Sequence, residues 1–280
     1  MRLKFRIFSL ILASLMLLTS CRTGNSGGWP SVGGASGGGQ NMGGSNGGNS
    51  DFDDSTLEEV ELRLTPEEDK IAVFALGAPD GFWARNDRGN SHPFNCSFSN
   101  QNAVVDSGLL TLSLTKNGNK YVGAEYRTHK HYSYGFYSVK MKAASCSGVI
   151  SSFFTYTGRP WDEIDIEFLG DDTTRVQFNY FTNGEGGHEY VYYLGFDASE
   201  DFHEYAFDWQ EDSITWYVDG KAVYRATEDI PKTGGQIMMN LWNVADSNAY
   251  WAGKFDPSKL PVYAQYEWIG YHSADSAEDK

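Results

Sequence analysis

From Ile71 onward, apolar and polar residues alternate with a period of two, as in strands that have one buried and one solvent-facing side. The alternation is clearest at Leu110, Leu112 and Leu114, and again from Ile214 to Val218. Turn dipeptides interrupt it about every eight to twelve residues, at Asn117-Gly118, Asn183-Gly184 and Asp219-Gly220 among others. The chain after residue 70 shows no convincing helical stripe. We therefore expect an all-β domain, a sandwich of two curved antiparallel sheets with a concave cleft on one face.

The first fifty residues follow a different pattern. Arg2, Lys4 and Arg6 precede an apolar run, which is the layout of a secretory signal peptide over residues 1–20. The run ends at Cys21 in a sequence that resembles the lipobox of bacterial lipoproteins, so we expect cleavage before Cys21 and lipid attachment to its thiol. Residues 21–50 are rich in Gly, Ser and Asn and predict a flexible tether. The expected location is the bacterial cell envelope; an ordinary signal peptide would give a freely secreted protein.

Acidic residues mark both ends of the expected domain. Residues 51–70 form an acidic segment that we interpret as a continuation of the linker, and residues 273–280 form an acidic tail. The β-sandwich is expected over residues 71–272.

The chain carries a formal net charge of −15. Such a surface repels nucleic acid and anionic lipid, so we expect no nucleic-acid partner and membrane contact through the N-terminal lipid only. A neutral polymer is not repelled, and the 17 Tyr, 17 Phe and 8 Trp offer rings on which sugars can stack. We expect a monomer.

No spacing of His and Cys predicts a zinc site, and no Gly-rich phosphate loop is present, so no cofactor is expected to be required. If Cys21 is lipidated, Cys96 and Cys146 remain, and an exported pair of cysteines is commonly a disulfide.

The most informative segment is Trp161-Asp162-Glu163-Ile164-Asp165-Ile166-Glu167-Phe168. In a strand, Glu163, Asp165 and Glu167 share one face, where three carboxylates repel one another. Such clusters separate pKa values and can hold a protonated acid beside an ionised carboxylate. Glycosidic cleavage needs that pair, one group to protonate the leaving oxygen and one to attack or activate water. A solvated acidic face or a calcium site would use the same residues.

Several segments in order resemble the bacterial β-1,3-1,4-glucanases, or licheninases, of glycoside hydrolase family sixteen, from about Phe82 to Tyr271. Besides the acidic strand, they are Phe94-Asn95-Cys96, Ala124-Glu125-Tyr126-Arg127, Ser151 to Gly158, Val176 to Tyr180, Leu194 to Ala198 and Ile237 to Trp242. The resemblance implies a jelly-roll sandwich and a retaining endo-glucanase acting by double displacement. It implies that Glu163 is the nucleophile, that Glu167 is the acid and base, and that Asp165 tunes the pair.

The spacing Glu-x-Asp-x-Glu also favours one branch of the family. Members that cut β-1,3-glucan usually carry an extra residue that bulges this strand, and this chain lacks it. The resemblance therefore implies mixed-linkage β-glucan, such as lichenan or cereal β-glucan, as the substrate. The alternatives are a β-1,3-glucanase or a xyloglucan-type transglycosylase on the same fold, and a non-catalytic glucan-binding lipoprotein.

Further positions are candidates for substrate binding. Trp161 shares the parity of the three acids, so its ring should reach the cleft, and Gln177, Asn179 and Phe181 alternate on the next strand. Glu125 and Arg127 match family positions that bind sugar hydroxyls, although such a pair on a sheet is often only a surface ion pair. The resemblance adds Asn90, Phe94, Tyr156, Asn240 and Trp242, of which Trp242 fits plain core packing best.

Two features depart from the family. Its usual disulfide joins the position of Cys96 to the position where this chain has Gly123, which leaves Cys146 as a substitute partner or a free thiol. Its calcium site uses backbone oxygens and an aspartate, and this chain has Glu267 in place of that aspartate, so a calcium ion bound there would be stabilising and not catalytic.

Overall fold

The computed structural model describes residues 62–89 and 92–275. The signal peptide, Cys21, the linker of residues 21–50, most of the acidic segment, Asn90 and the end of the tail lie outside the described residues. The described part is a sandwich of two antiparallel sheets, which confirms the expected all-β fold.

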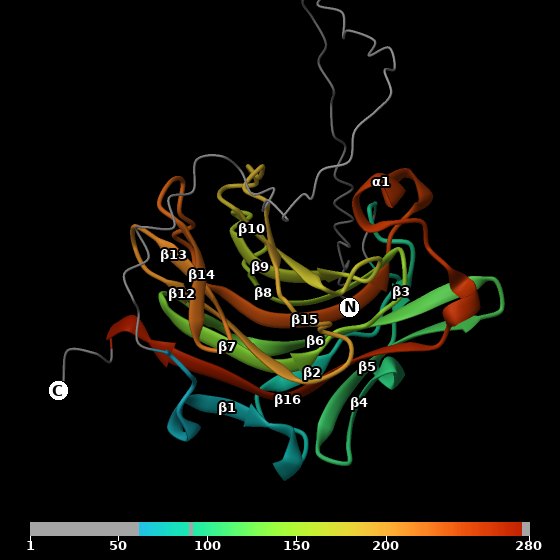
Figure 1. Cartoon of the computed structure of the whole chain (residues 1–280). Helices are drawn as coiled ribbons and strands as arrows, with labels where there is room; N and C mark the ends of the chain where they lie inside the picture. The colour runs from blue at the N-terminus through green and yellow to red at the C-terminus, as the bar shows by residue number, and fades with distance from the viewer. Residues whose placement is uncertain (1–61, 90–91, 276–280) are drawn as a thin grey trace, which may run out of the picture. The chain divides into compact units, whose positions relative to one another are not determined.

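The inner sheet carries the acidic strand at its centre. Its strands, in spatial order, are β11 (Tyr190–Tyr193), β10 (Arg175–Phe181), β9 (Glu163–Leu169), β8 (Val149–Tyr156), β15 (Gly235–Asn243) and β6 (Lys120–Tyr132), with β2 (Phe82–Ala84) and the short parallel β3 (Ser97–Phe98) beside β6. In Figure 1 these strands curve, with β8, β9 and β15 side by side.

The outer sheet lies beneath the inner one. Its strands, in spatial order, are β4 (Ala103–Asp106), β5 (Leu109–Asn117), β16 (Val262–Ser273), β7 (Gly135–Lys142), β12 (His203–Trp209), β13 (Ile214–Val218) and β14 (Lys221–Ala226), and β1 (Lys70–Val73) pairs with β16. The end of β5 pairs with the start of β6, and this pairing joins the two sheets.

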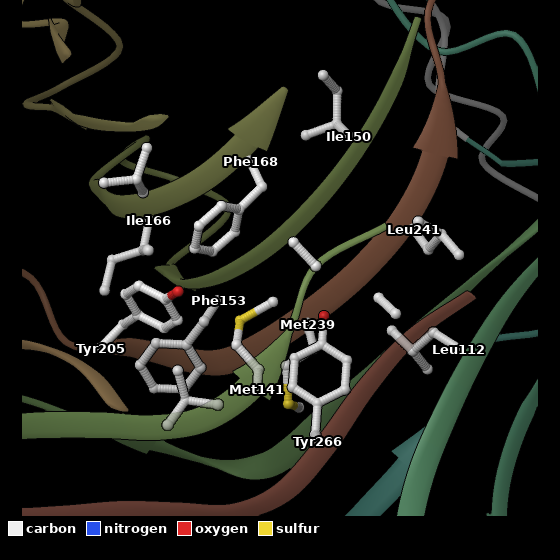
Figure 2. Packing of buried hydrophobic residues seen from close by; sticks show 14 of the residues in the cluster. Leu112, Met141, Ile150, Phe153, Ile166, Phe168, Tyr205, Met239, Leu241 and Tyr266 are labelled. Carbon is white, nitrogen blue, oxygen red and sulfur yellow. The ribbon is translucent and has the colours of Figure 1, made fainter. Parts of the chain in front are cut away.

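The core fills the space between the sheets, as Figure 2 shows. Ile166 and Phe168 of the inner sheet lie near Tyr205 of the outer sheet, and the rings of Phe168 and Tyr205 meet edge to face at 4.8 Å. On β5, Leu110, Leu112 and Leu114 are fully buried and alternate with less buried neighbours, because every second residue points inward. Burial of this apolar surface is the main force that holds the two layers together.

Helices are few and short. They are α1 (Ala249–Ala252) and the 3-10 turns η2 (Glu67–Asp69), η3 (Phe74–Leu76), η4 (Asn100–Asn102), η5 (Asp246–Asn248) and η6 (Pro257–Lys259). Among the residues that the structure describes, no helix is long and apolar enough to cross a membrane.

The backbone conformation of two expected turns explains why they contain Asn-Gly and Asp-Gly. Asn183 and Gly184 have φ of 53° and 83°, and Asp219 and Gly220 have φ of 47° and 79°. Backbones in this left-handed region favour Gly, Asn and Asp, and they match the twist of a hairpin.

The sandwich begins before the expected boundary at Ile71. The Arg63 N–H donates to the Gly220 carbonyl at 2.9 Å, and its guanidinium pairs with Asp208 on β12. The Thr65 N–H donates to the buried Glu204 carboxylate at 2.9 Å. Residues 62–70 are therefore packed on the outer sheet, because their polar groups find partners there that an acidic linker would not have.

Of the two alternatives for Cys96 and Cys146, the structure shows the free thiols, both of them buried, and not the disulfide. Cys96 packs against Gly123, whose missing side chain would meet the Cys96 Sγ at 3.1 Å. Cys146 faces elsewhere, and its thiol donates to the Asp256 carbonyl at 3.4 Å. Burial raises the pKa of the Cys96 thiol to about 11, so this thiol is unreactive at neutral pH.

Candidate active site

The three acids of β9 share one face of the inner sheet. Ile164, Ile166 and Phe168 point into the core and are fully buried, whereas Glu163 and Glu167 are partly exposed on the opposite, concave side. Asp165 lies between them and is 4% exposed. β9 pairs with β8 and β10 without a register shift, so the strand has no bulge. The structure therefore places Glu163 and Glu167 on one partly exposed face of the sheet, as the period-two pattern predicted.

Strand register places further polar side chains in line with the acids. One row crosses the sheet through Glu125, Asn240, Ser152, Glu167 and Gln177. Neighbouring rows pair Asp165 with Asn179 and Phe154, and Glu163 with Phe181 and Tyr156. The concave face thus carries the predicted residues of β6, β8, β9, β10 and β15 together, as sequential pairing of β9 with β10 led us to expect.

Each glutamate has its own hydrogen-bond donor. The Trp161 indole N–H donates to Glu163, and the Trp161 ring, 42% exposed, stacks on Phe181 with centroids 4.9 Å apart. The Gln177 side-chain Nε2 donates to Glu167 Oε2 at 3.0 Å. Trp161 is therefore an exposed aromatic residue beside Glu163, and not part of the core.

The pKa values of the three acids are all raised. Burial raises the pKa of Glu163 to about 7, opposed by its hydrogen bonds with Trp161 and Asp165. Burial and the charge of Glu163 raise the pKa of Glu167 to about 8, opposed by the Gln177 hydrogen bond. Burial, followed by the charges of both glutamates, raises the pKa of Asp165 well above its usual range. A protonated Asp165 donates to Glu163, which favours ionisation of Glu163 before Glu167.

Glu125 is not part of a surface ion pair. Its side chain is 1% exposed and lies between Arg85, at 3.2 Å, and Arg127, at 3.4 Å. Arg127 lies over the ring of Trp83, 4.2 Å from its centroid. The sequence drew no attention to Arg85 or Trp83, because their contact with Glu125 and Arg127 depends on the pairing of β2 with β6.

The remaining predicted residues flank the same face. Asn240 accepts a hydrogen bond from the Ser152 hydroxyl at 2.7 Å, and both are buried. Trp242 is only 3% exposed, and its ring stacks on Phe94 with centroids 3.9 Å apart. Trp242 therefore supports Phe94, which is partly exposed, rather than presenting its own ring to a ligand.

Asp162 ties three segments together beside Glu163. It is buried, and its carboxylate accepts the backbone N–H groups of Asn183 at 2.8 Å, Lys232 at 3.0 Å and Thr233 at 2.9 Å. Burial alone would raise its pKa, but these bonds lower it below the ordinary value. Because Asp162 follows Trp161 directly, the same bonds fix the position of the indole. Sequence reasoning missed this role, since Asp162 has the parity of the core residues.

Replacement of Asp162 by Ala should destabilise the fold by about 3–5 kcal/mol, because three backbone N–H groups lose a buried, charged acceptor. The melting temperature should then fall by about 10 °C, at the usual 2–4 °C per kcal/mol for a domain of this size. Thermal unfolding followed by circular dichroism measures this. Glu67→Gln removes an exposed ion pair with Lys70 and should change the melting temperature by less than about 2 °C. Equal effects of the two substitutions would contradict the role given to Asp162.

Glu267 is the side chain at which the resemblance implies a calcium site. A register shift between Tyr266 and Trp268 makes Glu267 a bulged residue of β16, and the Lys70 ammonium lies over the neighbouring Trp268 ring. Across residues 62–89 and 92–275, no group of three or more His, Cys, Asp or Glu could hold a metal ion. Calcium prefers six to eight oxygens, so these side chains alone do not fit it. Calcium binding stays a prediction, and the chemistry below uses no metal.

Known proteins are similar to this chain over most of the domain that carries the site. Residues 90–270 match the family described as Glycosyl hydrolases family 16. A β-glucanase of Brevibacillus brevis is 52% identical over 191 residues, which cover 65% of this chain and 73% of that protein. A xylanase/β-glucanase of Ruminococcus flavefaciens is 49% identical over 218 residues, and these are 72% of this chain but 27% of that longer protein.

A solved structure agrees with these relatives. The crystal structure of a prokaryotic β-1,3-1,4-glucanase (lichenase) derived from a mouse hindgut metagenome matches with a TM-score of 0.68 and 48% sequence identity. The match covers 71% of this chain and 96% of that one. The similarity therefore extends over most of the domain, and not only over the acidic strand.

Proposed function

The chain belongs to glycosyl hydrolases family 16, and on that premise we propose that it is a retaining endo-β-1,3-1,4-glucanase that cuts mixed-linkage β-glucan. One observation carries the proposal. The unbulged strand β9 presents Glu163 and Glu167 on the same accessible face of the sheet, with buried Asp165 between them. A glucan-binding module has no need of three clustered carboxylates with raised pKa values.

In the first step, a carboxylate oxygen of Glu163 attacks the anomeric carbon and forms a glycosyl ester. Glu167 transfers its proton to the glycosidic oxygen as the bond from that oxygen to the anomeric carbon breaks. The hydrogen bonds of Glu163 with Trp161 and Asp165 stabilise its ionised form before the attack.

In the second step, the ionised Glu167 takes a proton from water, and the oxygen of that water attacks the anomeric carbon. The ester bond breaks and Glu163 leaves as a carboxylate. Two displacements at the same carbon restore its original configuration. The Gln177 amide, which donates to Glu167, stabilises the ionised form that this step requires.

Several features support mixed-linkage glucan as the substrate. Polar rows of the inner sheet continue from β9 to β6 on one side and to β10 on the other. An enzyme that cuts inside a polymer must bind sugar units on both sides of the cut, and these rows offer polar groups on both sides. The net charge of −15 suits a neutral polysaccharide. The unbulged strand favours the mixed-linkage branch over β-1,3-glucanases, and one similar solved structure is that of a β-1,3-1,4-glucanase.

A substrate panel tests the proposal. The protein is incubated with barley β-glucan, lichenan, laminarin and carboxymethylcellulose, and released reducing ends are measured. We expect cleavage of barley β-glucan and lichenan, with little release from the other two. Cleavage of laminarin alone would mean that the substrate is β-1,3-glucan, and longer products formed from added oligosaccharide acceptors would indicate a transglycosylase.

The pH dependence of kcat/KM should be bell-shaped. Activity should rise as Glu163 loses its proton, with a pKa of about 7, and fall as Glu167 loses its proton, with a pKa of about 8. Because the ionisation of Glu163 is coupled to that of Glu167, the two apparent pKa values of the profile belong to the pair and not to either residue alone. Initial rates on barley β-glucan in constant ionic strength buffers from pH 4 to pH 10 measure the profile. Constant activity above pH 9 would contradict a general acid at position 167.

We also propose that the protein is exported and anchored in the bacterial cell envelope by a lipid on Cys21. The apolar run before Cys21 and the linker after it, which is uncharged from Thr23 to Ser50, support this. Cys21→Ser expressed in a bacterial host should move the protein from the membrane fraction to the soluble fraction, while Cys146→Ser should leave its distribution unchanged. If Cys21→Ser stays with the membrane, no lipid is attached there.

A further inference from the structure

Trp251 on α1 lies next to the proposed acid without touching it. Its indole N–H donates to Gln177 Oε1 at 3.1 Å, and Gln177 Nε2 donates to Glu167 Oε2 at 3.0 Å. Three residues from α1, β10 and β9 thus form one directed chain of hydrogen bonds that ends at Glu167.

Backbone contacts hold Trp251 in place. The Gly148 N–H, just before β8, donates to the Ala252 carbonyl at 2.8 Å, and Ala252 is fully buried. At Gly253 an added Cβ would meet Ser147 Oγ at 2.4 Å and Asp171 Cβ at 2.8 Å, so the end of α1 packs closely on the inner sheet. This short helix therefore keeps a defined position relative to β8 and β9.

The indole determines which way the amide of Gln177 points. A side-chain amide has a donor end and an acceptor end of nearly equal size, so it can rotate between two orientations. An indole N–H can only donate, and it therefore selects the orientation in which Oε1 faces Trp251. In that orientation the NH₂ group must face Glu167.

We propose that Trp251 is a positioning residue that acts through Gln177 to keep an N–H donor on Glu167. This inference rests on the proposed function, since it concerns the acid and base of that reaction. Without the indole, Gln177 can rotate and present its oxygen to a protonated Glu167. That contact stabilises the neutral form of Glu167 and disfavours the carboxylate that activates water.

Other groups also face Glu167 and must stay constant in any test. They are Glu163 and Asp165 on the same strand and Glu189 from the segment before β11, while β8 contributes the uncharged Ser152. None of them contacts Trp251 through a hydrogen bond, so substitution of Trp251 leaves their charges unchanged.

The test is a double-mutant cycle read from the alkaline limb of the kcat/KM profile on barley β-glucan. Trp251→Phe removes the N–H and keeps an aromatic ring. Loss of one donated hydrogen bond should move the limb to higher pH by about half a unit. Gln177→Leu should move it in the same direction, and the double variant should match Gln177→Leu alone. Should Trp251→Phe fail to fold, Trp251→Met, whose flexible apolar side chain has no N–H donor, takes its place.

Two results would overturn the proposal. The limb could stay unchanged in Trp251→Phe, or its shift could add in full to that of Gln177→Leu, which would mean that Trp251 acts independently of Gln177. Tyr250→Phe is the matched control, because Tyr250 lies on the same helix and is 87% exposed, and it should leave the profile unchanged. If the wild-type protein cut no glucan, the proposed function itself would fail, and that outcome is distinct from either of these.

Discussion

Glu163→Ala should lower kcat on barley β-glucan by at least about 10⁴-fold, the scale seen when one member of a catalytic unit is removed. Neither of the other two carboxylates of β9 is placed to replace it. Asp165 is buried, and burial with the charges of both glutamates raises its pKa well above the usual range, while Glu167 lies two positions beyond Asp165 and is assigned to the leaving oxygen. Glucan binding should persist, because the polar rows on either side of β9 are unchanged.

A reaction with azide distinguishes the loss of a nucleophile from other causes of lost activity. In Glu163→Ala the missing side chain leaves space for azide, which attacks the anomeric carbon once and gives a glycosyl azide of inverted, α configuration. An aryl oligoglucoside with a good leaving group is the substrate, and proton NMR identifies the product. Glu200→Ala, which removes an exposed glutamate, should retain full activity. Normal turnover in Glu163→Ala would remove Glu163 from the mechanism.

Glu167→Ala should lower activity on barley β-glucan by about 10²- to 10⁴-fold, the usual contribution of general acid and base catalysis. The poor leaving group of a polysaccharide needs the proton that Glu167 supplies. An aryl oligoglucoside with a good leaving group does not, so its first step should stay fast and the glycosyl ester should accumulate. The variant should also lose the alkaline limb of its pH profile, because that limb is assigned to Glu167.

Azide distinguishes the two glutamates. In Glu167→Ala it needs no base, so it should react with the glycosyl ester on Glu163 and give the β-azide, with retained configuration. Product analysis by NMR therefore gives opposite anomers for the two variants. An α-azide from Glu167→Ala would show that the roles of Glu163 and Glu167 are reversed.

Local patterns predicted the parts of this site that depend on one strand. A period of two placed Glu163, Asp165 and Glu167 on the same face, and it could do so because successive side chains of a strand must alternate. Turn chemistry predicted the hairpins, since few residues adopt positive φ. The position of Trp161 beside Glu163 followed from the same parity.

Contacts between distant segments could not be predicted in this way. The position of Asp162 in the alternating pattern predicts a core residue. Its carboxylate instead accepts hydrogen bonds from backbone N–H groups of two loops, and strand periodicity does not show where these loops lie. Trp251 reaches Gln177 only because α1 folds back over the inner sheet. The free thiols of Cys96 and Cys146 also depend on tertiary structure, because composition counts cysteines without showing which of them face each other. Burial of Glu125 between two arginines follows from the pairing of β2 with β6.

The central claim is that Glu163 and Glu167 act in turn at one anomeric carbon, and the configuration of the first product tests it most directly. The wild-type enzyme is added to barley β-glucan in an NMR tube, and the anomeric proton of the new reducing end is recorded before mutarotation. Double displacement predicts that the β-anomer appears first and the α-anomer only later. Initial formation of the α-anomer would mean a single displacement by water, and Glu163 would then not be a nucleophile.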